Sequence, residues 1–293
     1  MTEREKIAII FNPFSGRKKV HDLPFLIDKH LNKDIFEAHL FATQKAEDLT
    51  IFTQNAINNN FDIVVAAGGD GTIHNIASKL INTKTALSII PLGSGNGLAR
   101  HLKIPLDTAK AIAQLNTAIY KKIDTIAVNE HFCVNIAGIG YDGLISHAFA
   151  KKKKRGLMGY MQVIASNLPL KSNKMYLYEN NILIWSGNAI MCCIANATQW
   201  GNNVKLNKNA RLDDGILNIS IIKSLSPLAL PGVIYKTLSG NLSQSAQVAN
   251  FEGSEYRIES DIPLAMHIDG EPIYTTKKVE IKINPASLNI FSQ

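Results

Sequence analysis

The sequence predicts an α/β domain built on a parallel sheet, followed by a mainly antiparallel β domain. The chain has 293 residues, which is long for one hydrophobic core. In its first part, short apolar runs alternate with stretches of helical spacing, as in a parallel sheet covered by helices. From Ile119 onward helical stretches become fewer and strand-like runs follow one another, which indicates an antiparallel arrangement. We therefore expect two domains, over residues 1–125 and 126–283.

The first domain is expected to follow the order βαβαβαβα, with one more helix at its end. Apolar runs rich in branched residues predict its strands, at 6–11, 35–42, 62–67 and 86–91. Apolar residues at helical spacing predict its helices, near 23–31, 46–59, 73–81, from 98 onward, and 107–116. In such a sheet, ligands bind at the carboxyl ends of the strands.

Two glycine-rich loops follow the third and fourth predicted strands. The first, Gly68–Thr72, reads GGDGT, and the second, Leu92–Gly97, reads LGSGNG. Glycine lets backbone N–H groups converge on an anion at a helix N-terminus, where the helix dipole also favours negative charge. Two such loops at neighbouring strand ends make a crevice suited to a triphosphate.

Asp70 stands inside the first loop, where a phosphate would repel its carboxylate. Three roles stay open for it: holding magnesium through water, taking a proton from an attacking hydroxyl, or capping the helix that follows. Thr43, at the end of the second predicted strand, is a candidate cap for the next helix.

The net charge is +7 and the isoelectric point is near 9.2, which favours an anionic partner such as a nucleotide, a membrane surface or nucleic acid. No apolar run approaches the ~18 residues that a membrane span needs, and Thr2–Lys6 is too polar to begin a secretory signal. We therefore expect a cytoplasmic protein. Cys133, Cys192 and Cys193 are too few for a zinc site or a disulfide framework, and we expect buried thiols in strands.

The densest charge run, Lys151–Arg155, borders an apolar stretch that begins at Leu157. A basic collar beside apolar residues suits peripheral contact with an anionic membrane, and a solvated face is the alternative. Nucleic-acid binding would need basic residues spread along a face with stacking aromatics, and the sequence has no such pattern. We expect no nucleic-acid partner.

Two Asp-Gly pairs, at Asp214 and Asp269, lie between strand-like runs and are typical of tight hairpins. Each has an additional carboxylate beside it, Asp213 in the first and Glu271 in the second. Neighbouring like charges are tolerated when a cation lies between them or when one group stays protonated. The hairpin interpretation alone leaves these extra carboxylates unexplained.

Gly138, Gly140 and Gly143 spell GxGxxG after a strand and before a predicted helix, which is the dinucleotide fingerprint in short form. The acidic residue expected about 20 positions later is missing, and no βαβ unit surrounds the loop. A dehydrogenase is therefore discounted. Asp142, inside this segment, is a candidate helix cap.

Taken together, these motifs resemble the diacylglycerol kinase and sphingosine kinase superfamily. The resemblance covers nearly the whole chain and rests on five short motifs in order, at 12–16, 68–72, 93–96, 213–215 and 269–271. It implies an α/β nucleotide-binding domain of the NAD kinase and diacylglycerol kinase type, followed by a mainly antiparallel β-sandwich. It also implies that the C-terminal segment 284–293 returns to complete the first domain.

The same resemblance implies an ATP- and magnesium-dependent lipid kinase that phosphorylates a lipid hydroxyl in the cleft between the domains. It assigns ATP binding to Asn12, Ser15, Gly16, Arg17, Thr43, Gly68, Gly69, Asp70, Gly71, Thr72, Gly93, Ser94, Gly95, Asn96 and Asp269. It assigns the lipid head group to Asp142, and a structural magnesium ion to Asp214 with the backbones of Arg211 and Ile216. Glu271 or Asp70 would accept the proton of the acceptor hydroxyl.

Other functions stay open at this point. An NAD kinase-like enzyme shares the GGDG loop, and a nucleotide or lipid sensor of the same fold would bind without turnover. No GxxxxGK[ST] motif occurs, which excludes the common phosphate-loop kinases. Diacylglycerol, sphingoid bases and phosphatidylglycerol are all open as acceptors, and so is a homodimer as the oligomeric state.

Overall fold

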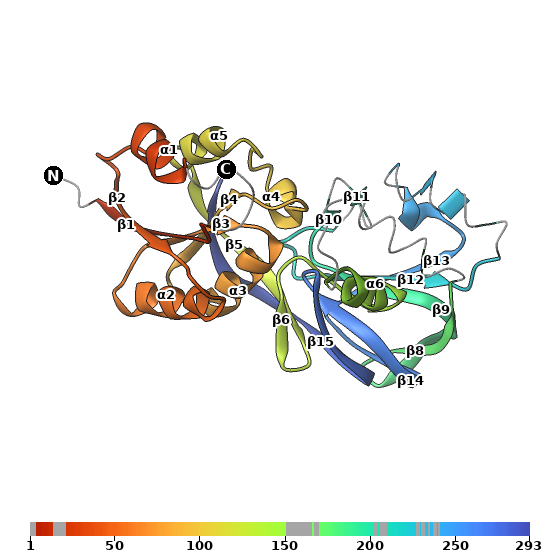
Figure 1. Ribbon diagram of the computed structural model, residues 1–293. Helices are drawn as coiled ribbons and strands as arrows, with labels where there is room; N and C mark the ends of the chain where they lie inside the picture. Colours follow the sequence, from red (N-terminus) through yellow and green to blue (C-terminus); the bar gives the residue numbers. More distant parts are fainter. Residues whose placement is uncertain are drawn as a thin grey trace. The chain divides into compact units, whose positions relative to one another are not determined.

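The computed structural model describes residues 4–13, 22–150, 166, 170–201, 204–205, 210–226, 229, 232–233, 235–236, 239 and 241–293. The chain divides into two compact units, Met1–Ile123 with Ala286–Gln293, and Asp124–Pro285. It passes from the first unit to the second within strand β5 (Ile119–Val128) and returns within strand β15 (Glu271–Ser292) (Figure 1).

A parallel sheet forms the centre of the first unit. Its strands are β1 (Glu5–Phe11), β2 (Phe36–Ala42), β3 (Ile63–Gly68), β4 (Ala86–Pro91) and the end of β15. They lie in the order β15-β4-β3-β1-β2, and every neighbouring pair is parallel. The strand order reverses at β1, so the carboxyl ends of β1 and β3 flank a topological switch point, where α/β sheets bind ligands.

Helices cover both faces of this sheet. Helices α1 (Leu23–His30) and α5 (Thr108–Leu115) contact each other on one face, and α2 (Glu47–Asn58) and α3 (Asp70–Leu80) contact each other on the opposite face (Figure 1). The short helix α4 (Gly97–His101) follows β4. Strands β3 and β4 are buried at every position, which explains their continuous apolar sequence.

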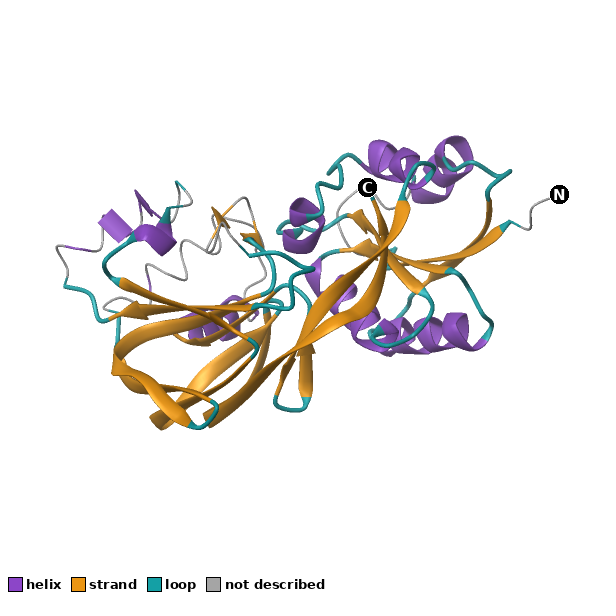
Figure 2. Ribbon diagram, turned by 180° about the vertical axis from the view of Figure 1, so that it is seen from behind, coloured by secondary structure: helices purple, strands orange, loops and turns teal. Residues whose placement is uncertain are grey.

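The second unit is built mainly from antiparallel strands (Figure 2). These strands are β6 (His131–Cys133), β7 (Ile136–Gly140), β8 (Asn173–Glu179), β9 (Ile182–Ala195), β12 (Leu217–Lys223), β13 (Val248–Gly253), β14 (Glu255–Ile268) and the first part of β15. A small hairpin joins β10 (Gln199–Gly201) to β11 (Val204–Lys205), and helix α6 (Tyr141–Ala150) and the 3-10 turn η2 (Leu242–Gln244) complete the described elements.

Two long strands, β9 and β14, connect the layers of this unit. The first half of β9 pairs with β8, and its second half pairs with β7 and β12. Strand β14 likewise pairs with β8 near its start and with β7 near its end, with irregular register between Glu259 and Met266. The side chains between these layers form a core of aliphatic residues with Cys133, Cys192, Met175 and Tyr256.

The predicted fold class is confirmed: an α/β domain with a parallel sheet precedes a mainly antiparallel β domain. The C-terminal segment 284–293 belongs almost entirely to one long strand, β15, whose last part pairs with β4 through Ile290 and Leu87. All three cysteines are buried free thiols, as expected. Within the described ranges, no helix has both the length and the apolar character to cross a membrane.

Candidate functional site

The two glycine loops of the first unit meet backbone to backbone. A Cβ atom added to Gly93 would lie 2.5 Å from the Cα of Gly69, far inside van der Waals contact. A Cβ atom added to Gly68 would lie 2.5 Å from Oγ1 of Thr72, which packs over it. The glycines therefore permit a close approach between the ends of β3 and β4 that any side chain would prevent.

Asp70 joins the first loop to the second. Its Oδ2 accepts a hydrogen bond from the backbone N–H of Asn96 at 2.9 Å, and its Oδ1 accepts one from the N–H of Gly97 at 2.8 Å. Gly69 occupies the N-cap position of α3, and Asp70 is the first residue of that helix. Asp70 is therefore not the N-cap of α3, and both of its carboxylate oxygens accept N–H groups at the start of α4.

Asn96 holds the second loop in a closed shape. Its backbone is left-handed, with φ of 53°. Its side chain accepts from the N–H of Gly93 at 3.1 Å and donates to the carbonyl of Gly93 at 2.9 Å. The Arg100 guanidinium donates to the carbonyl of Gly95 at 3.0 Å. Hydrogen bonds from Asn96 and Arg100 thus hold the loop from Gly93 to Asn96, and Ser94 is exposed at its tip.

The remaining predicted ATP residues lie at neighbouring strand ends. Asn12 directly follows β1, and Thr43 directly follows β2. Thr43 is 2% exposed, and its hydroxyl donates to the carbonyl of Phe11 at 3.4 Å. Helix α2 begins at Glu47 after Ala46, so Thr43 is not its cap. Ser15, Gly16 and Arg17, and the basic run Lys151–Arg155, lie outside the described residues.

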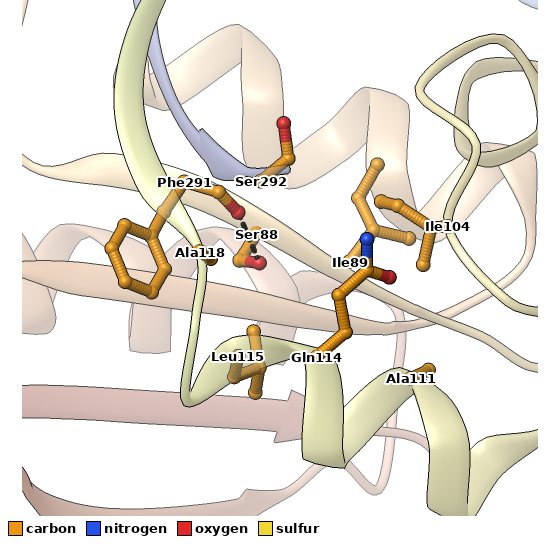
Figure 3. Close-up of a pocket in the computed structure, with 9 residues that line it drawn as sticks. All are labelled: Ser88, Ile89, Ile104, Ala111, Gln114, Leu115, Ala118, Phe291 and Ser292. Carbon is orange, nitrogen blue, oxygen red and sulfur yellow. Dashed lines mark hydrogen bonds between the residues drawn. The ribbon is translucent and has the colours of Figure 1, made fainter.

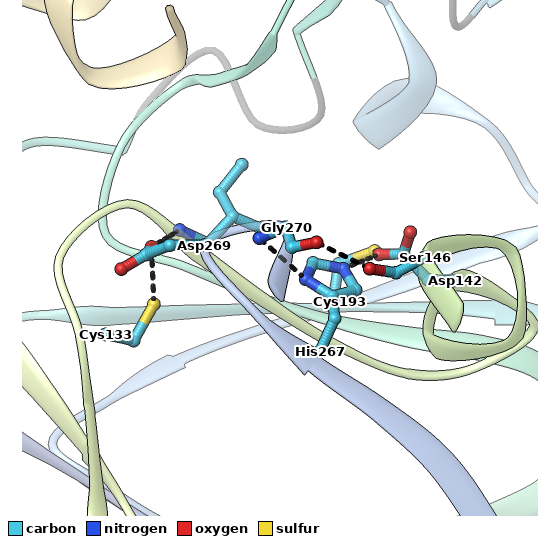
Figure 4. Close-up of polar contacts among 8 residues, drawn as sticks. Cys133, Asp142, Ser146, Cys193, His267, Asp269 and Gly270 are labelled. Atoms are coloured by element: carbon cyan, nitrogen blue, oxygen red, sulfur yellow. Dashed lines mark hydrogen bonds and ion pairs between the residues drawn. The ribbon is translucent and has the colours of Figure 1, made fainter. Parts of the chain in front are cut away.

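In the second unit, Asp269 is bound by the backbone of residues 134–136, where β7 begins. Its carboxylate accepts the N–H groups of Val134, Asn135 and Ile136 at distances of 3.0, 2.8 and 3.1 Å. The Cys133 thiol donates to it at 3.2 Å (Figure 4). Burial and the neighbouring carboxylate raise the pKa of this thiol well above its ordinary value, so it stays a donor.

Asp142 faces His267 in the interior of the same unit. The distance from His267 Nε2 to Asp142 Oδ2 is 2.8 Å, and the side chains are 2% and 1% exposed. Burial alone lowers the pKa of His267, but the carboxylates of Asp142 and Asp269 outweigh it, and the pKa is raised above its ordinary value. A Cβ atom on Gly138 would lie 2.1 Å from Asp142 Oδ2, so this glycine makes room for the pair.

The GxGxxG segment therefore serves packing in this fold. Gly140 has a positive φ of 87°, and a Cβ atom on Gly143 would lie 2.3 Å from the backbone of Ala265. Helix α6 consequently packs directly on β14. The helix begins at Tyr141, and the Asp142 carboxylate contacts His267, so the interpretation of Asp142 as a cap for a helix starting at Gly143 is wrong.

The loop predicted to hold magnesium runs from Arg211 to Ile216. Asp214 Oδ1 accepts the N–H of Ile216 at 3.0 Å, and Asp213 forms an exposed ion pair with Arg211 at 3.1 Å. Asp124, which is 3% exposed, accepts the N–H of Gly215 at 2.7 Å. In the part of the chain that the structure describes, no group of three or more His, Cys, Asp or Glu side chains is arranged to hold a metal ion.

A small cavity in the first unit is not this site. Its volume is about 10 Å³, room for a single water molecule, and it lies between β4, α5 and the end of β15. It is lined by Ser88, Ile89, Ile104, Ala111, Gln114, Leu115, Ala118, Phe291 and Ser292 (Figure 3). The buried Oε1 of Gln114 has no protein partner, so a water molecule would suit this cavity.

Two family descriptions match the chain. Residues 6–128 match the diacylglycerol kinase catalytic domain, and residues 139–292 match the YegS C-terminal NAD kinase beta sandwich-like domain. This chain belongs to the diacylglycerol kinase superfamily. The predicted membership is confirmed, and so is the prediction that the chain is a kinase of this superfamily.

Individual relatives agree with this membership. A protein named diacylglycerol kinase from Staphylococcus aureus is 27% identical over 92% of this chain and 86% of its own length. An uncharacterized protein from Synechocystis is 29% identical over 97% of this chain and 69% of its own length.

Solved structures share the fold. A crystal structure of a diacylglycerol kinase from Bacillus anthracis has a TM-score of 0.78 and 20% identity, and covers 100% of this chain and 98% of its own. An NAD kinase from Archaeoglobus fulgidus in complex with ATP has a TM-score of 0.52 at 13% identity, covering 98% of this chain and 93% of its own. At these identities both likenesses concern the fold alone.

Some residues of these constellations are not singled out by the sequence. His267, Ser146 and Asp124 each contact a predicted site segment, and none belongs to a recognised motif. The one local signal is the position of His267, two residues before Asp269. The roles of individual residues toward ATP, acceptor and metal stay predictions.

Proposed function

We propose that the chain is an ATP- and magnesium-dependent lipid kinase that transfers the γ-phosphoryl group of ATP to a hydroxyl group of a diacylglycerol or sphingoid lipid. One observation carries the nucleotide half of this proposal. The two glycine loops at the ends of β3 and β4 are joined through Asp70 and through the contact between Gly69 and Gly93. Joined loops present backbone N–H groups at fixed positions, as phosphate recognition requires.

The residues around these loops form the proposed ATP site. Glycine backbones of both loops bind the phosphates, with Asn12 contributing from the end of β1. Asp70 keeps the loops together, since its carboxylate accepts N–H groups of the second loop rather than facing a phosphate. Phosphoryl transfer passes through a loose transition state, so holding the phosphates in a fixed place is most of the catalytic task.

Magnesium fits the donor atoms of the loop around Asp214. This ion prefers oxygen ligands, and the loop offers the Asp214 carboxylate and the backbone carbonyls of Arg211 and Ile216. The buried carboxylate of Asp124 orders the loop through the N–H of Gly215.

At the proposed ATP site, ATP would supply the phosphoryl group, and magnesium at its phosphates would neutralise their charge.

Glu271 is the proposed acceptor of the proton from the lipid hydroxyl. It is exposed at the start of β15, directly after the turn at Asp269 and Gly270. Asp70 is the less suitable base, because its two oxygens already accept backbone N–H groups at 2.9 and 2.8 Å. General-base assistance of this kind is worth roughly 100-fold or more in rate.

A lipid acceptor is supported by the relatives that bear the name diacylglycerol kinase. The basic run Lys151–Arg155 beside apolar residues suits an anionic membrane surface, where such acceptors reside. Neutralising this run is expected to weaken binding to anionic vesicles. Unaltered vesicle affinity would return the run to an ordinary solvated face.

The direct test is transfer of labelled phosphate from ATP, with magnesium, to diacylglycerol, sphingosine and phosphatidylglycerol in mixed micelles. NAD serves as the soluble control acceptor. We expect label in one lipid class and none in NAD. Label in NAD alone, or ATP binding without transfer to any acceptor, would overturn the proposal.

A further inference from the structure

The turn before Glu271 is unusually well anchored. Asp269 and Gly270 both have positive φ angles, 50° and 87°, and reverse the chain between β14 and β15. Glu271 is the next residue and begins β15. The direction of the Glu271 side chain therefore depends on how firmly the peptide units of this two-residue turn are held.

Three separate groups hold the turn (Figure 4). The Asp269 carboxylate accepts backbone N–H groups of residues 134–136, where β7 begins. The N–H of Gly270 donates to Nδ1 of His267 at 3.2 Å, and the hydroxyl of Ser146 donates to the carbonyl of Gly270 at 2.6 Å. That carbonyl belongs to the peptide bond that links Gly270 to Glu271. Side chains thus hold both the N–H and the carbonyl of Gly270, the residue before Glu271.

His267 is oriented in turn by Asp142. Because Nδ1 accepts the N–H of Gly270, the proton of a neutral ring is on Nε2, which lies 2.8 Å from the Asp142 carboxylate. Asp142 comes from the first turn of α6, the same helix that supplies Ser146. One helix therefore controls the turn by two routes, through His267 to the N–H of Gly270 and through Ser146 to its carbonyl.

Burying a carboxylate and an imidazole together does little to stabilise a protein core. Removing two such groups from water costs free energy that their mutual attraction often fails to recover. Three features of the fold nevertheless accommodate this pair: Gly138 leaves room for it, Gly143 brings α6 close to β14, and Cys193 Sγ lies 3.9 Å from Asp142 Oδ2. An arrangement of this kind is better explained by the orientation it gives to a neighbouring group.

We propose that His267, oriented by Asp142 and assisted by Ser146, is a positioning residue that fixes the backbone in front of Glu271 and so aims its carboxylate at the acceptor hydroxyl. The inference rests on the proposed function, with Glu271 as proton acceptor. His267 contacts no substrate in this account. A displacement of about 1 Å in a catalytic group costs on the order of 100-fold in rate, so loss of the anchor lowers turnover rather than ATP affinity.

Two substitutions distinguish the contact made by Nδ1 of His267 from the contact made by its Nε2. In His267→Asn the amide oxygen stands near the position of Nδ1 and can still accept from Gly270, whereas the contact with Asp142 is lost. In His267→Gln the amide group stands near Nε2 and can still face Asp142, whereas the acceptor for Gly270 is lost. We expect kcat to fall on the order of 10- to 100-fold in His267→Gln and much less in His267→Asn, with the KM for ATP unchanged in both.

The control is His39→Gln, since His39 forms a comparable pair with Glu37, at 2.9 Å, on the surface of the first unit. This variant should keep wild-type kcat. Ser146→Ala supplies a second measurement if the His267 variants fail to fold, because it removes only the hydroxyl at the Gly270 carbonyl. We expect several-fold lower kcat with an unaltered KM for ATP.

Several results would overturn the proposal: equal kcat in both His267 variants, a loss confined to the KM for ATP, or wild-type kcat in Ser146→Ala. Failure of the proposed function is recognised separately, because wild-type protein would then transfer no phosphate to lipid. In that case nitrogen NMR of His267 still tests the anchor. We expect the Nε2–H tautomer whenever the ring is neutral, and an Nδ1–H tautomer would contradict the anchor itself.

Discussion

At the scale of single residues, two carboxylates predicted as functional act through backbone N–H groups. Asp70 accepts two of them from the start of α4, and Asp269 accepts three from residues 134–136, where β7 begins. A carboxylate has several lone pairs and suits clusters of donors that no neutral side chain satisfies equally well. Both residues therefore shape the backbone of a loop next to the proposed chemistry.

Asp70→Asn is expected to weaken ATP binding about tenfold. The amide can accept only one of the two N–H groups, and its NH₂ would face the other donor, which costs about 1–3 kcal/mol. Titration calorimetry with ATP measures the change. Asp107→Asn is the matched control, because Asp107 accepts the N–H of Lys110 at the start of α5, and asparagine caps helices equally well. Unchanged ATP affinity in Asp70→Asn would contradict this role.

The stability contributed by His267 is expected to depend on pH. The groups that face its ring are the Asp142 and Asp269 carboxylates and the Cys193 thiol beside Asp142. The pKa of His267 is raised in the folded state above its ordinary value of 6.5, so its contribution is complete below that pH. This ion-pair contribution is lost as the pH rises through the raised value, where the ring becomes neutral and Nδ1 is free to accept the N–H of Gly270.

Urea unfolding of wild type and His267→Gln at about pH 5.5 and about pH 8.5 measures this dependence. The difference in unfolding free energy should be larger at the lower pH. A difference that is constant, or larger at the higher pH, would show that the ring is not held by its carboxylate neighbours.

At the scale of elements, the glycine loops depend on the strands that carry them. Strands β3 and β4 are adjacent and parallel, with Gly68 opposite Pro91, so both loops leave the sheet at the same level. The loops can then touch only if no side chain separates Gly69 from Gly93. The sequence requirement for glycine follows from this parallel register.

Gly93→Ala is therefore expected to destabilise the first unit by about 1–3 kcal/mol, as overpacking usually does, and to weaken ATP binding. The added methyl would lie 2.5 Å from Gly69 Cα and 2.9 Å from Asn96 Oδ1. Gly232→Ala is the control, since nothing lies within 4 Å of a Cβ atom there. Thermal unfolding with and without ATP measures both effects. A Gly93→Ala protein that behaves like the control would show that the loops separate freely.

How far the sequence predicted these elements depends on the range of the interactions. Periodicity predicted the strands before both glycine loops and the helix capped by Asp107, because these signals are local. The partner of Asp70 lies 26 residues away, and Gly270 and Ser146 are 124 residues apart. No local sequence pattern predicts such contacts. The resemblance to the kinase superfamily identifies Asp142 as a candidate site residue. Its pairing with His267 depends on how α6 packs on β14, which the sequence does not predict.

At the scale of the whole molecule, the C-terminal strand belongs to both units. Strand β15 starts after the anchored turn in the second unit and ends beside β4 in the first. There Ser88 donates to the carbonyl of Phe291 at 2.7 Å, and the Phe291 ring packs edge-on against Phe36. The last residues of the chain therefore complete the core that carries the proposed ATP site.

Phe291→Ala is expected to destabilise the first unit by about 3–5 kcal/mol, the usual cost of removing a buried ring. Phe291 is 5% exposed, whereas Phe25, on the surface of α1, is 65% exposed. Phe25→Ala is therefore the matched control and should change stability little. Hydrogen exchange of β3 and β4 amides reports on this unit specifically. If these amides exchange as slowly in Phe291→Ala as in the wild type, the Phe291 ring does not stabilise this core.

In the proposed mechanism Asp70 shapes the ATP site, and Glu271 accepts the proton of a lipid hydroxyl. The most direct measurement is the rate of phosphate transfer to lipid by Glu271→Gln at saturating ATP, together with its ATP affinity. We expect turnover to fall roughly 100-fold or more, with ATP affinity unchanged. Turnover near the wild-type rate would contradict this mechanism and return the role of proton acceptor to Asp70.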